Sequence, residues 1–409
     1  MAMIDQVVSL AQRLVRIPSP SGQERAAVEL LAGSMRAQGF AVRIDAAGNA
    51  IGTLGRGLPG HPRVVIDGHI DTIPPPADGD WSRDPFGAEI LDDRLYGLGV
   101  CDQKASLAAA VVGLGSMAQR FAASPGMVSL VASVSEEFME GAALAYALDV
   151  LRPTCVVITE PSELKLMVGH RGRAKLQVEI AGRSAHAARA TDGVNAAEAL
   201  ADLLVELRRA PRPNHSRLGY RDITCIDVVS SPFPSVSTVP GRVQARFDVR
   251  FLPEDTEEEL HALFSHAAAR AWKNWPQPPS LSVGTVEVSA LTYTGQELAV
   301  REIAPGWWTE GALVDTARAA LASIGLSDTP GVYSICTNGS LTAGGRGVPT
   351  IGFGVGEQHM AHRADEYVHV GALLDGARGY AALAAALLEG QVPGNARECG
   401  ISAGTSEAH

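Results

Sequence analysis

Apolar residues in the N-terminal part of the chain gather in short runs that alternate with stretches of helical spacing. Runs of this length that are apolar throughout are typical of strands buried on both faces, as in a parallel sheet covered by helices. The pattern therefore predicts an α/β unit with a mostly parallel central sheet. The predicted strands lie near 41–46, 50–55, 63–67, 128–134 and 154–159, and the predicted helices lie near 103–118 and 141–150.

A helix is also expected shortly after position 20. Ser21 and Glu24 have the spacing of a capping box, in which each side chain bonds the other residue's backbone N–H at a helix start. Apolar residues recur at helical spacing from Ala27 to Met35, and Gly39 is a suitable end point.

From Ala174 onward the pattern changes to strict alternation. Polar and apolar residues alternate in 175–180 and again in 243–250, which predicts half-exposed antiparallel strands. Helices are expected near 194–208 and 255–271. A chain of 409 residues exceeds what one core usually serves. We expect an α+β domain over 174–290, inserted into a discontinuous domain formed by 1–173 and 291–409.

Acidic residues and histidines follow the apolar runs of the first domain. Each has an ordinary interpretation by itself: a polar strand end, the N-cap of a helix, or a solvated acidic loop. Together they are better explained by a metal site, because open α/β sheets place ligand sites at the carboxyl ends of their strands and adjacent buried carboxylates need a compensating cation. The candidates are His69, Asp71, Asp102, Glu136, Glu137, Glu160, His359 and His362.

In this order, the motifs resemble those of the zinc-dependent metallohydrolases that include acetylornithine deacetylase, succinyl-diaminopimelate desuccinylase, aminoacylase and glutamate carboxypeptidase. The resemblance covers nearly the whole chain. A branch linked to selenium metabolism is similar at Asp102-Gln103, in 170–173 and in 365–368. The resemblance implies a zinc-peptidase-like catalytic domain with an inserted α+β lid, which also serves as the dimerisation domain. It further implies a homodimer with twofold symmetry.

The resemblance also implies a role for each candidate. Asp102 would bridge two divalent ions, most plausibly zinc, with cobalt or manganese as alternatives. His362 is preferred to His359 as the last ligand because the sequence after it matches the family motif. Glu136 would be the general base, and Asp71 would orient His69. The implied ligands are His69, Asp102 and Glu160 for one ion, and Asp102, Glu137 and His362 for the other.

Further residues carry implied roles in substrate binding. His186, in the stretch 182–188, would stabilise the oxyanion across the dimer, although without the resemblance it reads as a turn residue. Arg250 matches an arginine associated with a substrate carboxylate, although it could equally be an ordinary surface residue. Asn338, which replaces a frequent Asp, is taken as a substrate contact. Gln103 and Ser237 also depart from the family pattern, Gln103 after a peptide bond that is usually cis.

Charge and cysteine content narrow the classes of function. A net charge of -11 argues against nucleic acid or an anionic membrane as partner. No signal peptide or membrane-spanning run is visible, and five scattered cysteines fit a reducing compartment, so we expect a cytoplasmic protein. Cys101 is expected to pack beneath the site rather than act as a nucleophile. The residues from Gly394 to His409 are expected to form a loose tail.

The expected reaction is metal-assisted hydrolysis of an amide bond in a small N-acyl amino acid or a related carboxylate-bearing compound. A dipeptidase or carboxypeptidase activity on the same scaffold is the main alternative. A non-catalytic binding protein and a site with a single ion are further alternatives.

Overall fold

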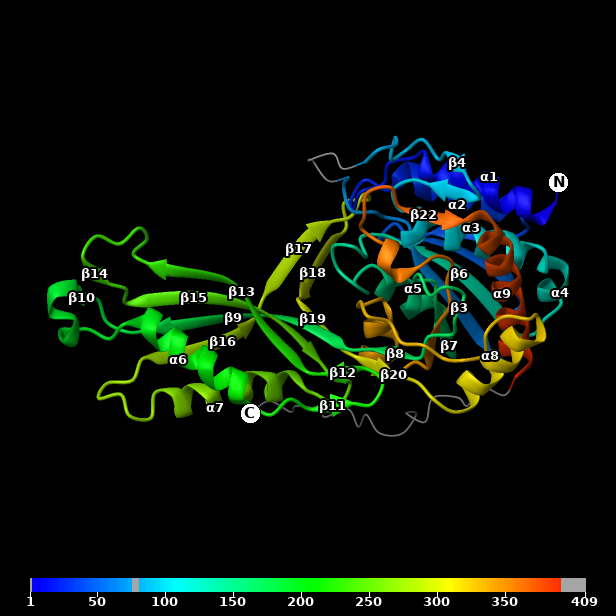
Figure 1. Ribbon diagram of the computed structural model, residues 1–409. Coiled ribbons are helices and arrows are strands. Elements are labelled where there is room, and N and C mark those ends of the chain that lie inside the picture. The colour runs from blue at the N-terminus through cyan, green and yellow to red at the C-terminus, as the bar shows by residue number, and fades with distance from the viewer. Residues whose placement is uncertain (1, 76–80, 391–409) are drawn as a thin grey trace, which may run out of the picture.

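A computed structural model describes residues 2–75 and 81–390 of the chain, so Cys399 and the predicted tail from Gly394 lie outside the described residues. The molecule has two lobes (Figure 1). One contains both ends of the described chain and the larger hydrophobic core, and the other is an elongated α+β unit with its own core.

The first lobe is built on a mixed six-stranded sheet. Four neighbouring strands, from β6 to β21, run parallel, whereas β2 is antiparallel to β6 and β1 is antiparallel to β2. The prediction of an α/β fold with a mostly parallel sheet is confirmed. In spatial order the strands are β1 (Ala41–Ile44), β2 (Ala50–Gly55), β6 (Met127–Ser133), β3 (Arg63–His69), β7 (Cys155–Ile158) and β21 (Thr350–Gly352).

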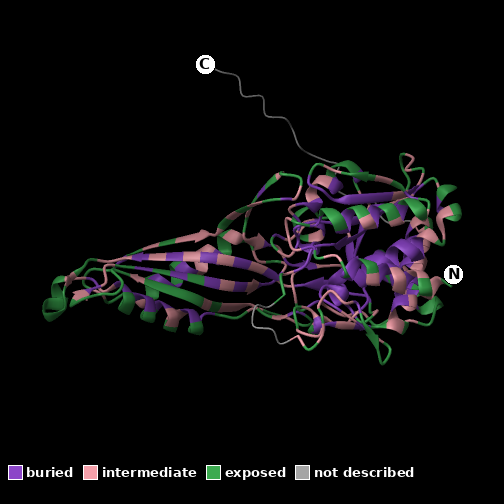
Figure 2. Cartoon of the chain, turned by 90° about the horizontal axis from the view of Figure 1, so that it is seen from above, coloured by how far each residue is buried: buried purple, intermediate pink, exposed green. Residues whose placement is uncertain are grey.

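Helices cover both faces of this sheet, and strand alternation explains how. In β3, Val64 and Ile66 point into the larger core, whereas Val65 points into the core on the opposite face. Figure 2 shows the resulting buried interior. The larger core includes residues of α1 (Met3–Val15), α2 (Arg25–Ala37), α3 (Ala105–Gly115), α4 (Ala118–Ala122), α8 (Ala312–Ser323) and α9 (Val370–Glu389), and the opposite core includes α5 (Leu144–Leu151).

Short elements complete the first lobe. A three-stranded sheet pairs β5 with both β4 and β22, and a two-stranded sheet pairs β8 with β20 where the chain passes between the lobes. A π-helical turn over Val100–Lys104 precedes α3, and another spans Ser340–Gly345. The strands are β4 (Ile90–Leu91), β5 (Arg94–Tyr96), β8 (Gly169–His170), β20 (Trp307–Trp308) and β22 (Tyr367–His369).

The second lobe is an antiparallel sheet with two helices on one face. Apolar residues at alternate positions of β9 and β15 face α6 and α7, as the alternating pattern predicted. The helix α7 begins with a true capping box between Thr256 and Glu259. The sheet order is β13 (Asp222–Ser231), β15 (Arg242–Phe251), β9 (Gly172–Ala181) and β16 (Ser280–Thr285), with β19 (Ile303–Ala304) also on β9; the helices are α6 (Ala196–Arg209) and α7 (Glu257–Ala271).

Three small strand pairs extend from the second lobe. The hairpin formed by β17 (Glu287–Leu291) and β18 (Glu297–Arg301) reaches the first lobe, where Tyr293 Oη donates to Gly48 O at 2.8 Å. The predicted domain boundary at 290 therefore falls inside β17. The other pairs are β10 (Ala185–His186) with β14 (Thr238–Val239), and β11 (Asn214–His215) with β12 (Gly219–Tyr220).

The capping box expected at Ser21 and Glu24 is wrong. The helix α2 begins at Arg25, and neither side chain caps it. Ser21 Oγ donates instead to Asp71 Oδ2 at 2.7 Å, and Glu24 Oε1 accepts from the backbone N–H of Ser135 at 3.0 Å. Ser21 is thus bonded to the segment that follows β3, and Glu24 to the segment that follows β6. Local spacing does not reveal these long-range contacts.

Within the described residues, none of the helices is both long enough and apolar enough to cross a membrane.

Candidate metal centre

The candidate ligands come together at one edge of the central sheet. His69 ends β3, Glu136 and Glu137 follow β6, and Glu160 follows β7. Since these three strands are parallel neighbours, their carboxyl ends meet. Asp102 joins them from the π-helical turn before α3, and His362 joins them from the loop before β22.

His69 lies at the centre of the first group. It is 1% exposed, and its Nε2 lies 2.9 Å from Asp102 Oδ1, 3.7 Å from Glu160 Oε1 and 4.0 Å from Glu136 Oε2. On the other side of the ring, Nδ1 lies 2.9 Å from the backbone oxygen of Asp71. A proton on Nδ1, donated to that oxygen, leaves Nε2 free to bind a metal.

His362 lies in the second group. Its Nε2 is 2.9 Å from Glu137 Oε1 and 3.5 Å from Asp102 Oδ2. The two oxygens of Asp102 thus face different histidines, as a bridging carboxylate requires. His359 is turned away, because its Nδ1 pairs with Glu357 at 3.3 Å. Of the two candidate histidines, only His362 lies with the other candidate ligands.

Geometry alone groups the ligand atoms differently from the resemblance. Within 4.8 Å of one another, the structure offers one set of His69, Glu136 and Glu160 and a second set of His69, Asp102 and Glu137. The first set uses Glu136, the expected base, in place of Asp102. The sets differ because Glu136 and Asp102 both approach Nε2 of His69.

Burial and mutual charge shift the ionisation of the group. Burial raises the pKa of Glu136 and of Glu160 well above the usual glutamate range. Burial disfavours the charged form of His69, but the hydrogen bond and charge of Asp102 outweigh it and raise the pKa of His69. The hydrogen bond to His69 likewise overcomes the effect of burial and lowers the pKa of Asp102. So many buried carboxylates are costly to ionise unless cations compensate them.

Asp71 holds the backbone on which Glu136 and Glu137 sit. Its carboxylate accepts the N–H of Glu136 and the N–H of Glu137, each at 3.1 Å, as well as the hydroxyl of Ser21. Its Oδ1 lies 3.6 Å from His69 Nδ1, so the closer contact to His69 comes from the backbone oxygen of Asp71. The side chain therefore organises the acidic turn more directly than it orients the histidine.

Glu366 is a supporting residue whose role the sequence did not reveal. It is 1% exposed and accepts the N–H groups of Gly99, Cys101 and Asp102 at 2.8, 2.6 and 3.0 Å. The peptide bond between Asp102 and Gln103 is cis, as the resemblance implied. In the sequence, the motif that contains Glu366 was used only to choose His362 over His359. The acidic residue in that motif was itself a signal that Glu366 has a hydrogen-bond partner.

Asn338 lies below the site and not at its surface. It is 2% exposed; its amide nitrogen donates to Asp67 Oδ2 at 2.8 Å and to Ser133 Oγ at 3.1 Å, and its oxygen accepts from Gly141 N at 2.6 Å. With both ends of the amide engaged inside the protein, the expected direct contact with substrate is not what this structure shows. Asn338 instead ties the end of the loop after Glu137 to the central sheet.

The structure does not bring His186 or Arg250 to the ligands. His186 lies exposed on β10, at the end of the second lobe remote from the central sheet (Figure 1), and its Nδ1 accepts from Ala188 N. Arg250 lies on the polar face of β15 and pairs with Asp248 at 2.8 Å. A role for either at the metal centre requires a second subunit or movement of the lobes.

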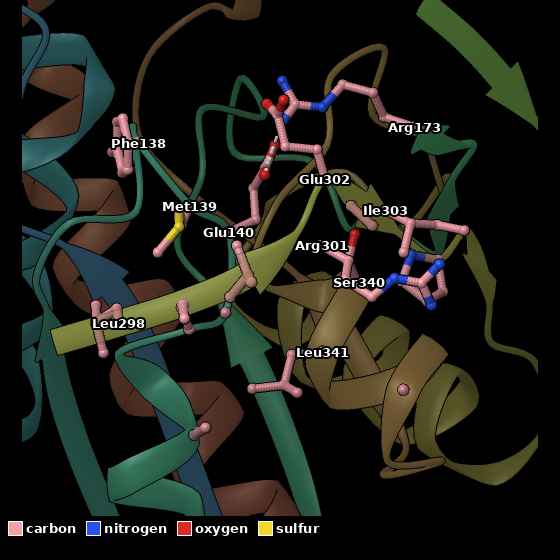
Figure 3. Close-up of a pocket in the computed structure, with 18 of the residues that line it drawn as sticks. Phe138, Met139, Glu140, Arg173, Leu298, Arg301, Glu302, Ile303, Ser340 and Leu341 are labelled. Carbon is pink, nitrogen blue, oxygen red and sulfur yellow. Dashed lines mark hydrogen bonds and ion pairs between the residues drawn. The ribbon is translucent and has the colours of Figure 1, made fainter. Parts of the chain in front are cut away.

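A cavity of about 580 Å³ borders the segment that directly follows Glu137. Figure 3 shows Phe138 and Glu140 on one side, with Leu298 and Ile303 on the strands that return from the second lobe. The guanidinium of Arg173, at the start of β9, pairs with Glu140 at 2.7 Å. The loop that follows Glu137 and the base of the second lobe are thus in direct contact.

The donor set fits divalent cations. Two histidines and several carboxylates, most of them buried, suit zinc, cobalt or manganese. Within residues 2–75 and 81–390, the buried Oε1 of Glu136 has no hydrogen-bond partner, which leaves it available to a water molecule or a cation. The arrangement can hold metal ions and has a carboxylate with a free oxygen beside them.

Comparison with known proteins agrees with this chemistry. The model of the family described as "Peptidase family M20/M25/M40" matches residues 65–386. The chain is 28% identical over 390 residues to YgeY of Escherichia coli (strain K12), an uncharacterized protein, covering 90% of this chain and 91% of that one. It is 26% identical over 385 residues to the acetylornithine deacetylase of Klebsiella pneumoniae (strain 342), covering 88% and 92%.

Solved structures share the fold across both lobes. Aminopeptidase PepT from Bacillus cereus ATCC 10987 aligns with a TM-score of 0.72 at 20% identity, covering 94% of this chain and all of that one. The Bacillus subtilis YXEP protein, a dinuclear metal binding peptidase, aligns with a TM-score of 0.72 at 14% identity, covering 95% and 98%.

Proposed function

Because this chain belongs to peptidase family M20/M25/M40, and is thus a metal-dependent hydrolase of amide bonds, we propose that it is a deacylase of small N-acyl amino acids. The gathering of Asp102, Glu137, Glu160 and two histidines beside Glu136, whose Oε2 lies 4.0 Å from His69 Nε2, carries the proposal. The likeness to an acetylornithine deacetylase supports the choice of substrate class.

We propose that the site holds two divalent ions, zinc in the first instance. His69, Asp102 and Glu160 would hold one, and Asp102, Glu137 and His362 would hold the other. The two oxygens of Asp102 lie near different histidines, which supports its role as the bridge. Such a pair of ions polarises the scissile carbonyl and makes a water molecule more acidic.

The protein's own residues then move the proton. Glu136 takes a proton from the attacking water and returns it to the nitrogen of the departing amine. A base works best with a pKa near the working pH, and burial shifts the pKa of Glu136 upward in that direction. Asp71 keeps Glu136 in place by accepting its backbone N–H.

Two residues of the second lobe are proposed to act on the substrate when the lobes or subunits come together. His186 would donate a hydrogen bond to the oxyanion from the second subunit, since within its own chain it lies away from the metal ligands. Arg250 would exchange its pairing with Asp248 for the substrate carboxylate, which suits a guanidinium by its two parallel donors.

The edge of the second lobe supports the proposed homodimer. The outermost strand β13 leaves Ile226, Val228 and Val229 about half exposed, and Phe233 beyond it is 80% exposed. Apolar edge strands of this length are usually covered by another chain.

Val228→Glu is expected to convert the dimer to monomer, because it places a charge in the proposed interface, and to lower activity if His186 acts across it. Light scattering after size exclusion measures the mass. Val150→Glu, at a site 55% exposed on α5, is the matched control and should remain dimeric. A wild-type protein that is monomeric at working concentration would refute the interface.

We also propose a cytoplasmic location. The thiols of Cys101, Cys155, Cys225 and Cys336 are all free, which suits a reducing compartment.

The test of the proposed substrate class is release of free amine from a panel. The metal-loaded protein is given N-acetyl, N-succinyl and N-carbamoyl amino acids beside dipeptides of matched side chains. We expect turnover of one acyl class, with at least roughly tenfold lower kcat/KM on the dipeptides, because a site built for one acyl group leaves polar groups unpaired with another. Cleavage of dipeptides alone would favour the alternative.

That alternative is a dipeptidase or carboxypeptidase of the same family. It is supported by the solved structures of similar fold, which include a dipeptidase, Dug1p of Saccharomyces cerevisiae (TM-score 0.67, 16% identity, covering 95% of this chain and 98% of that one). Both reactions use the same metals and base, so the panel separates them and variants of the metal centre do not.

A further inference from the structure

Glu24 is a buried carboxylate outside the proposed set of ligands. It immediately precedes α2 and has no exposed surface. Burying a carboxylate costs free energy unless hydrogen bonds or charges compensate it, so Glu24 is expected to have specific partners. The helix does not supply one, since the side chain of Glu24 does not cap α2.

Two of the three hydrogen bonds that Glu24 accepts come from Ser135, the residue before Glu136. Its Oε1 accepts from Gly22 N at 2.8 Å, from Ser135 N at 3.0 Å and from Ser135 Oγ at 3.3 Å. Ser135 has a φ of 57°, in the left-handed region that non-glycine residues rarely adopt. This residue reverses the chain after β6, and the next residue is Glu136. Glu24 thus holds the residue whose conformation sets the direction of the proposed base.

Asp71 completes this arrangement. It accepts the N–H of Glu136 and the N–H of Glu137, so Glu24 and Asp71 together bind three consecutive N–H groups of the turn. Ser21 Oγ, three residues before Glu24, donates to Asp71 at 2.7 Å. The segment 21–24 therefore contacts Ser135 directly through Glu24, and it reaches Glu136 and Glu137 indirectly, through the bond of Ser21 to Asp71.

We infer that Glu24 is a positioning residue for the reaction: by holding Ser135 in its left-handed conformation, it aims Glu136 at the attacking water. The inference rests on the proposed role of Glu136. Glu24 acts through Oε1 as an acceptor, because its contacts to Ser135 and Gly22 are all made by this oxygen to donors. A substitute side chain that accepts the same hydrogen bonds should therefore preserve activity, and one that cannot accept them should lower it.

The test compares Glu24→Gln and Glu24→Met at saturating metal. Gln retains an acceptor oxygen at the same reach, so its kcat should stay within about threefold of wild type. Met fills the space but leaves the N–H of Ser135 unpaired, so kcat should fall roughly 10- to 100-fold with KM and metal content unchanged, as expected for a misplaced catalytic group. Glu29→Met, on the exposed side of the same helix, is the matched control and should keep wild-type kcat.

Hydrogen exchange provides a readout that does not depend on turnover. Peptides covering 134–138 should exchange faster in Glu24→Met than in wild type, Glu24→Gln or Glu29→Met. Wild-type kcat together with wild-type exchange in Glu24→Met overturns the inference. If Glu24→Met does not fold, Glu24→Asp decides, because it keeps the charge but is one methylene too short, and it should show the same loss of kcat and faster exchange. Absence of amide hydrolysis by the wild type would refute the proposed function instead, while exchange still reports on the contact.

Discussion

Glu136→Gln is expected to lower kcat by about 10²- to 10⁴-fold, the usual contribution of a general base. The amide keeps the size of the side chain and leaves the N–H of Glu136 bonded to Asp71, but it cannot take a proton from water. Because Glu136 is not among the proposed ligands, the metal content should stay at the wild-type value. Steady-state kinetics with metal analysis of the same sample measures both quantities.

The matched control is Glu140→Gln, four residues further along the same loop. Glu140 pairs with Arg173 and does not contact His69, so its loss should change kcat by no more than a few fold. Unchanged turnover in Glu136→Gln with full metal would remove Glu136 from the role of base. Loss of metal together with loss of turnover would show that Glu136 is a ligand, as the geometric set of His69, Glu136 and Glu160 allows.

Removal of metal is expected to abolish turnover altogether. Without cations the reaction loses the groups that polarise the carbonyl and acidify the water, and Glu136 has no activated water to deprotonate. After exhaustive chelation, activity should return on addition of zinc, cobalt or manganese, and it should rise until two equivalents per chain are bound. Activity measured against added equivalents gives the stoichiometry.

Two histidines provide a matched pair for this titration. His362→Ala should require a higher metal concentration for full activity, since His362 contacts Glu137 and Asp102. His359→Ala should titrate as wild type, because His359 pairs with Glu357 outside the site. Full activity at one equivalent per chain would favour the single-ion alternative, and activity that survives chelation would contradict metal dependence.

The sequence was most informative where strand order decides the geometry. The nearly continuous apolar runs ending at His69, Glu136 and Glu160 belong to parallel neighbours, so their carboxyl ends had to meet once the sheet formed. Periodicity of two also identified the second lobe, because alternate residues of β9 and β15 face its helices. These features depend on local pattern, which the sequence displays directly.

Contacts between distant segments could not be predicted in the same way. Ser21 and Glu24 have the spacing of a capping box, but their partners Asp71 and Ser135 lie far along the chain. Asn338 was expected to face substrate and is instead enclosed between Asp67 and Gly141. Such polar side chains form hydrogen bonds with the donors and acceptors that the fold brings near them. The charge and spacing of residues in the sequence do not predict these partners.

The roles of His186 and Arg250 rest on resemblance alone. Both lie on the second lobe, and within one chain neither approaches the metal ligands. Their proposed action depends on a subunit contact or a domain movement. The exposed strand β13 is the part of this lobe that we propose as the contact between subunits.

The most direct test of the whole account is anomalous diffraction from crystals grown with zinc, recorded at its absorption edge. We expect two peaks about 3.5 to 4 Å apart on either side of the carboxylate of Asp102. One should be bound by His69 and Glu160 and the other by Glu137 and His362, with Glu136 near both but bound to neither. A single peak held by His69, Glu136 and Glu160, or no peak among these residues, would contradict it.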